Sequence, residues 1–105
     1  SLFENLIITD ILKERFNHGL SKNMYFWRDN TGHEIDLVIE EAHKNIPVEI
    51  KSGKTITPAF FKGLTFWKKL ADQPNGYIVY DGDTIQKRSN GITILPYSRA
   101  SDIVL

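Results

Sequence analysis

The chain has 105 residues, 41% hydrophobic and 25% charged, which fits one ordinary globular domain and leaves no room for a second. Thirteen Lys and Arg balance thirteen Asp and Glu, so no overall basic field draws the domain to nucleic acid or to an anionic membrane. Cysteine is absent, which excludes disulfides, thiolate metal sites and cysteine nucleophiles. No apolar run approaches the roughly 20 residues of a membrane span and no signal peptide is present, so we expect a cytoplasmic domain.

Apolar periodicity and turn signals divide the chain into helices and strands. Gly19 permits the stop of a first helix, and Thr57 caps a second helix with Pro58 at its first position. Asn90-Gly91 is typical of a two-residue hairpin turn. The predicted elements are a helix at 2–16, strands at 24–28, 34–40 and 46–51, a helix at 57–70, a strand at 77–80, a hairpin at 84–88 and 92–95, and a helical turn at 98–105.

This order, α-β-β-β-α-β followed by a C-terminal hairpin, predicts an α/β (α+β) domain with a central mixed sheet flanked by helices. A polar turn around 42–45 joins the two middle strands, which should therefore pair antiparallel. Alternation places Ile35, Leu37 and Ile39 on one face. The apolar faces match in a register whose opposed pairs are Ile35 with Ile50, Leu37 with Val48, and Ile39 with Ile46.

The same register places Asp36 opposite Glu49, on the face that also carries Lys51. Opposed carboxylates repel, so a positive group is expected between them, either Lys51 or a divalent cation. Glu4, at the margin of the first helix's apolar stripe, is a candidate third carboxylate. The alternatives are a solvated face with ion pairs worth about 0.2–1 kcal/mol each, and a first-turn acid favoured by the helix dipole.

Charge is unevenly distributed along the chain. Residues 29–49 hold six acids against one base, whereas residues 50–71 hold five lysines and no acid. An acidic pocket beside a basic helix suits a metal ion and the phosphates that it would engage. We expect His33 to be a surface residue of a turn, with contact to phosphate as the alternative. The candidate nucleic-acid-binding residues, which otherwise only aid solubility, are Lys54, Lys62, Lys68 and Lys69.

Asp36, followed after twelve residues by Glu49-Ile50-Lys51, resembles the PD-(D/E)XK nuclease-like superfamily, which implies a restriction-endonuclease-like core. A narrower resemblance covers nearly the whole chain, to the uncharacterised domain at the C-terminal end of prokaryotic AAA-type ATPases. The segments that carry it are Leu2-Phe3-Glu4-Asn5, Gly32-His33-Glu34-Ile35-Asp36-Leu37-Val38, Val48-Glu49-Ile50-Lys51-Ser52-Gly53-Lys54, Gly63-Leu64 before Phe66, Gly91-Ile92 and Leu95-Pro96.

By position, the resemblance implies that Asp36 and Glu49 are catalytic ligands of Mg²⁺ or Mn²⁺ and that Glu4 is an accessory ligand. It implies that Lys51 positions or activates the attacking water. It also makes residues 1–105 a single nuclease-like domain and a C-terminal fragment of a larger ATPase, in agreement with a start at Ser1 without an initiator Met. ATP would then bind only in the missing ATPase domain.

Three functions remain open, so whether the domain is an enzyme is uncertain. The first is metal-dependent hydrolysis of nucleic-acid phosphodiester bonds. The second is binding of DNA without cleavage, through the lysines. The third is docking to, or regulation of, its own N-terminal ATPase domain. No membrane partner is expected.

Overall fold

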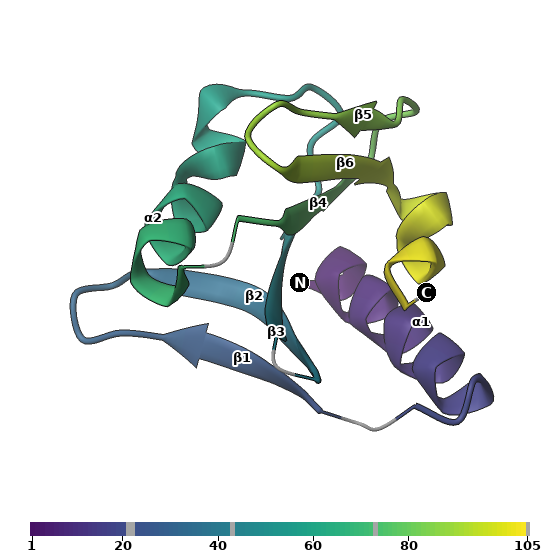
Figure 1. Cartoon of the computed structure of the whole chain (residues 1–105). Coiled ribbons are helices and arrows are strands. Elements are labelled where there is room, and N and C mark those ends of the chain that lie inside the picture. Colours follow the sequence, from purple (N-terminus) through teal and green to yellow (C-terminus); the bar gives the residue numbers. More distant parts are fainter. Residues whose placement is uncertain (21–22, 43, 73, 105) are drawn as a thin grey trace.

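The computed structural model describes residues 1–20, 23–42, 44–72 and 74–104. Figure 1 shows one twisted sheet with helices on both faces. The elements are α1 (Leu2–Asn17), β1 (Met24–Arg28), β2 (Glu34–Glu41), β3 (Lys44–Lys51), the 3₁₀-helix η1 (Pro58–Phe61), α2 (Lys62–Ala71), β4 (Gly76–Tyr80), β5 (Gln86–Lys87), β6 (Ile92–Pro96) and the 3₁₀-helix η2 (Tyr97–Val104).

The six strands form a mixed sheet in the order β1-β2-β3-β4-β6-β5. β3, β4 and β6 run parallel to one another, whereas β1, β2 and β5 pair antiparallel with their neighbours. The predicted α/β class and element order are confirmed. None of the described helices has both the length and the apolarity needed to cross a membrane.

Several boundaries differ from the prediction. The predicted hairpin strand at 84–88 is reduced to the two residues of β5, and residues 88–91 separate it from β6 in place of a two-residue turn. β3 begins at Lys44 because Glu41 pairs with Lys44, so the predicted turn at 42–45 is shorter than expected; its position 43 lies outside the described residues. The second helix opens as η1, and within the described chain the Thr57 hydroxyl makes no capping bond. The predicted stop of α1 is confirmed, since Gly19 adopts a left-handed φ of 71° just beyond it.

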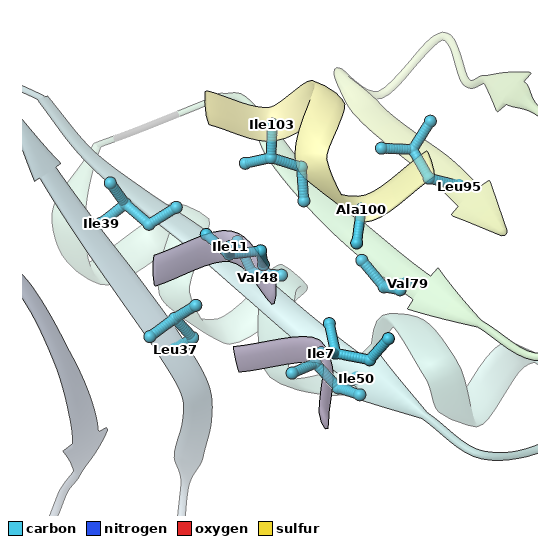
Figure 2. Packing of buried hydrophobic residues seen from close by; sticks show 10 residues of the cluster. All are labelled: Ile7, Ile11, Leu37, Ile39, Val48, Ile50, Val79, Leu95, Ala100 and Ile103. Carbon is cyan, nitrogen blue, oxygen red and sulfur yellow. The ribbon is translucent and has the colours of Figure 1, made fainter. Parts of the chain in front are cut away.

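Each face of the sheet buries its own apolar cluster. On one face, α1 and η2 pack side by side on the strands, as the close view in Figure 2 shows. On the other face, α2 packs on β2 and β3. The first cluster consists of Ile7, Ile11, Leu37, Ile39, Val48, Ile50, Val79, Leu95, Ala100 and Ile103, and the second of Ile35, Val38, Leu64, Trp67, Ile78, Tyr80, Ile92 and Ile94.

A β-bulge in β2 changes the predicted faces. Tyr25 pairs with Val38 but Trp27 pairs with Ile35, so two residues of β2 oppose one residue of β1. The extra residue reverses the alternation, and Ile35 is buried with Val38 beneath α2 instead of sharing the face of Leu37. The prediction that Ile35 shares the face of Leu37 and Ile39 is therefore wrong.

The predicted register of β2 and β3 is confirmed where the two strands pair. Leu37 lies opposite Val48 and Ile39 lies opposite Ile46. Among the described residues, this pairing does not extend to Ile35, because β2 continues along β1 while β3 continues along β4. The sheet therefore forks at this end.

A buried arginine links α1 to the other end of β2. Arg15 is only 2% exposed, and its guanidinium lies 2.9 Å from a carboxylate oxygen of Glu41, which is half-exposed. A buried guanidinium needs its hydrogen-bond acceptors. Removing one acceptor leaves charge in the protein interior uncompensated, which costs more free energy than an exposed ion pair contributes.

We expect Glu41→Gln to lower the free energy of unfolding by about 1–3 kcal/mol, because the buried guanidinium loses its anionic acceptor. Urea denaturation measures this change. The matched control is Asp102→Asn, which breaks the exposed pair between Arg99 and Asp102 and should cost less than about 1 kcal/mol. Equal losses in the two variants would contradict the prediction.

Candidate functional site

The predicted carboxylates meet where β2 and β3 separate. The main-chain N–H of Asp36 donates to Glu49 Oε1 at 3.1 Å, and the N–H of Ile50 donates to Asp36 Oδ2 at 2.8 Å. Each acid thus satisfies an amide of the opposite strand, where a regular ladder would use a carbonyl. The two side chains are thereby fixed at the fork of the sheet.

Lys51 completes the group. Its Nζ lies 3.2 Å from Glu49 Oε2, and the Glu49 side chain is 6% exposed whereas that of Lys51 is 31% exposed. Lys51, one of the two positive groups expected beside the carboxylates, thus lies next to Glu49. The structure thus brings Asp36, Glu49 and Lys51 together.

The group opens into a cavity of about 320 Å³. Three segments form its walls, namely the turn between β1 and β2, the fork itself, and the junction of η1 with α2. Gly63 allows α2 to approach closely, because a Cβ there would lie 3.3 Å from both Glu49 Oε2 and the main-chain oxygen of Glu34. The lining residues are Thr31, Gly32, His33, Glu34, Asp36, Glu49, Lys51, Ala59, Lys62 and Gly63.

Burial dominates the electrostatics of the fork. Burial, together with the neighbouring Asp36 charge, raises the pKa of Glu49 to about 7, while Lys51 opposes the shift. The pKa of Asp36 is also raised by burial, against the opposing bond from the Ile50 amide. Near neutral pH, the carboxyl pair therefore keeps one proton in a fraction of the protein molecules. This proton reduces the repulsion between Asp36 and Glu49.

Glu4 lies on the first turn of α1, where its main-chain N–H donates to the Ser1 hydroxyl at 3.2 Å. Burial raises the pKa of its carboxyl, and the Asp36 charge raises it further, so the two acids interact electrostatically. Across the described residues, however, no group of three Asp, Glu, His or Cys side chains is arranged to hold a metal ion. Glu4 does not join the other two acids in such a cluster.

The four predicted nucleic-acid-binding lysines are dispersed. Lys62 lines the cavity. Lys54 lies 3.9 Å from Asp81, and Lys68 donates to the main-chain oxygen of Asn90 at 3.3 Å. Lys69 is exposed in the last turn of α2. The structure therefore brings only Lys62 of these four to the wall of the described cavity.

The sequence did not predict the place of Gly63, and it favoured a surface turn for His33, with contact to phosphate as the alternative. His33 lies on the cavity wall, and its ring stacks on Phe66 of α2 with a centroid separation of 3.6 Å. The spacing of Asp29 and His33 in one turn was a usable signal. The close approach of α2 to the fork had none, because it depends on tertiary packing.

Fold and site together define a mixed-sheet α/β domain with a carboxylate–lysine pocket at a strand fork. A family model described as "Domain of unknown function (DUF4143)" matches residues 1–100, and the chain belongs to this family. Neither a curated protein nor a solved structure matches the sequence. The family description names neither an ATPase nor a PD-(D/E)XK nuclease.

The raised pKa of Glu49 makes stability depend on pH. Between its ordinary value of 4.5 and about 7, the folded chain binds more protons at this site than the unfolded chain. The free energy of unfolding therefore falls as the pH rises through this window, by roughly 1–3 kcal/mol. We expect Glu49→Gln to remove that fall and to be more stable than the unmodified protein above the window.

Urea denaturation at pH about 5 and about 8 measures the effect. Glu40→Gln, an exposed change on the neighbouring strand β2, is the matched control and should keep the slope of the unmodified protein. If the free energy of unfolding of Glu49→Gln fell with pH as steeply as that of Glu40→Gln, the pH dependence could not be assigned to Glu49.

Proposed function

We propose that this domain hydrolyses phosphodiester bonds of nucleic acid with the help of a divalent cation. One observation carries the proposal: Asp36, Glu49 and Lys51 converge at the fork and open together into one cavity. Two carboxylates with raised pKa values and an adjacent ammonium group are the residue types that metal-assisted hydrolysis of a phosphate ester requires.

The donor set fits Mg²⁺ or Mn²⁺. One oxygen of each acid accepts a main-chain amide, so the candidate ligands are the other two, Asp36 Oδ1 and Glu49 Oε2, the latter 3.2 Å from Lys51 Nζ. Mg²⁺ commonly uses only one or two carboxylates and keeps several waters, so the absence of a three-acid cluster in the described chain is compatible with it. Glu4 would act as an accessory group through its interaction with Asp36.

The chain's own residues would then share the work. A divalent cation, when bound, supplies Lewis-acid polarisation of a phosphoryl oxygen. Asp36 and Glu49 hold it, and their bonds to opposite amides keep both carboxylates in place. Lys51, beside Glu49, stabilises negative charge that develops on the phosphate and positions the attacking water. Lys62 adds a second positive charge on the cavity wall.

The resemblance to the PD-(D/E)XK superfamily and to the C-terminal domains of prokaryotic AAA-type ATPases supports this proposal. In that setting the fold would be restriction-endonuclease-like, and the partners would be DNA and the chain's own ATPase domain, in the cytoplasm. These links extend beyond the family match, which assigns no activity.

A second candidate is a nuclease-fold module that no longer cleaves and instead binds DNA or regulates the ATPase. The observation that favours it is the ion pair of 3.2 Å between Lys51 and Glu49, which already compensates the buried acid. The two candidates differ in whether a cation displaces this arrangement.

Titration of Mn²⁺ by calorimetry separates them. We expect the unmodified domain to bind the cation with release of protons near pH 6, because Glu49 holds a proton up to about pH 7. We expect Glu49→Gln to weaken binding by about 100-fold or more. Glu40→Gln again serves as the control and should bind normally.

Cleavage of single- and double-stranded DNA is then measured with the same proteins. Loss of cleavage in Glu49→Gln with a retained fold supports hydrolysis. Equal Mn²⁺ binding by the unmodified protein and Glu49→Gln, or no cleavage despite binding, would count against hydrolysis. If DNA binding survives Glu49→Gln but weakens steeply with salt, the module that only binds is favoured.

A further inference from the structure

The imidazole of His33 is held from two sides. Its Nδ1 lies 3.1 Å from Asp29 Oδ2 in the turn between β1 and β2. One face of the ring stacks on Phe66 of α2, with the ring planes 3° apart. Phe66 in turn lies against Trp27 of β1, with 6.2 Å between the ring centroids. The ring therefore bridges the turn and the helix that form two walls of the cavity.

The turn does not need this ring. Asp29 Oδ1 already accepts the main-chain N–H groups of Thr31 and His33, both at 2.9 Å, and the Asp29 N–H donates to the His33 oxygen at 2.9 Å. These bonds close the turn through main-chain groups and the Asp29 carboxylate, without the imidazole. The contacts of the imidazole with Asp29, with the Thr31 hydroxyl at 2.9 Å and with Phe66 orient the ring on the wall of the cavity.

The geometry leaves one nitrogen of the ring for a ligand. With Nδ1 bonded to Asp29, the nitrogen on the far edge of the ring is Nε2, for which the described residues record no partner. A protonated imidazole carries an N–H donor at Nε2 and a positive charge, the features that recognise a phosphate oxygen. Lys62 shares the same wall and adds a second cation.

We propose that His33 is a substrate-contacting residue that donates from Nε2 to a non-bridging oxygen of a bound phosphodiester, together with Lys62. This inference deepens the proposed hydrolytic function and rests on it for the identity of the ligand. The charged groups that surround the ring in the turn, at the fork and on α2 are Asp29, Glu34, Asp36, Glu49, Lys51 and Lys62.

Side-chain NMR of the histidines tests the contact directly, with the dinucleotide dTpdT as probe in the presence of Mg²⁺. We expect the His33 ring resonances to shift saturably. His18 is an internal control, because it also pairs with an acid, at 3.4 Å from Glu14, but lies beyond α1 and away from the cavity lining. Equal shifts of both histidines would reveal non-specific binding and overturn the proposal.

A double variant, Asp36→Asn with Glu49→Gln, separates failure of this inference from failure of the proposed function. The two substitutions remove the carboxylates that would hold the cation, and with them the repulsion of a phosphate group. The dinucleotide dTpdT can therefore be added to this variant without metal. A saturable His33 shift in this variant supports the contact even if the unmodified protein binds no cation and cleaves nothing. Absence of the shift in both proteins overturns the contact even if cleavage is observed.

Affinity measurements exclude a merely structural role. We expect His33→Gln to weaken dTpdT binding about tenfold, the loss of one charge-assisted hydrogen bond. Glu40→Gln, an exposed change on β2 outside the cavity lining, should change affinity little. A loss of less than about twofold in His33→Gln would overturn the proposal.

Discussion

Two hydrogen bonds from main-chain amides to acidic side chains hold β2 and β3 together at the point where their own pairing ends. They satisfy buried amides that a diverging sheet would otherwise leave without acceptors. They also hold Glu49 and Asp36 in low-dielectric surroundings, and this burial raises the pKa values of both. The cavity, its charge and its chemistry all follow from this arrangement at the fork.

Much of this arrangement is encoded in strand alternation. A strand pair with one apolar face tolerates only even shifts of register, so the match of Leu37 with Val48 also brings Asp36 near Glu49. Gly19 likewise predicts the end of α1 that the structure reproduces. Asn90-Gly91 does lie between β5 and β6, but the connection covers residues 88–91 in place of the predicted two. These features depend on neighbours in sequence or on directly opposed residues, which is why the sequence alone could predict them.

The remaining features depend on contacts between elements distant in the chain. The bulge that turns Ile35 toward α2 arises from pairing with β1, and no period within β2 predicts it. The placement of Gly63 against Glu49 and of Phe66 against His33 follows from how α2 packs on the sheet. Spacing could suggest Glu4 as a third acid, but its distance from the fork is set by the packing of α1.

The same two hydrogen bonds make the backbone a reporter of the site. The amides of Asp36 and Ile50 donate to titrating carboxylates, whereas most strand amides donate to carbonyls that never change charge. Hydrogen–deuterium exchange at these two positions should therefore follow the ionisation of the acids while the rest of the sheet stays protected. Occupancy of the fork by any ligand is thus readable from two unlabelled main-chain protons, without an assay of activity.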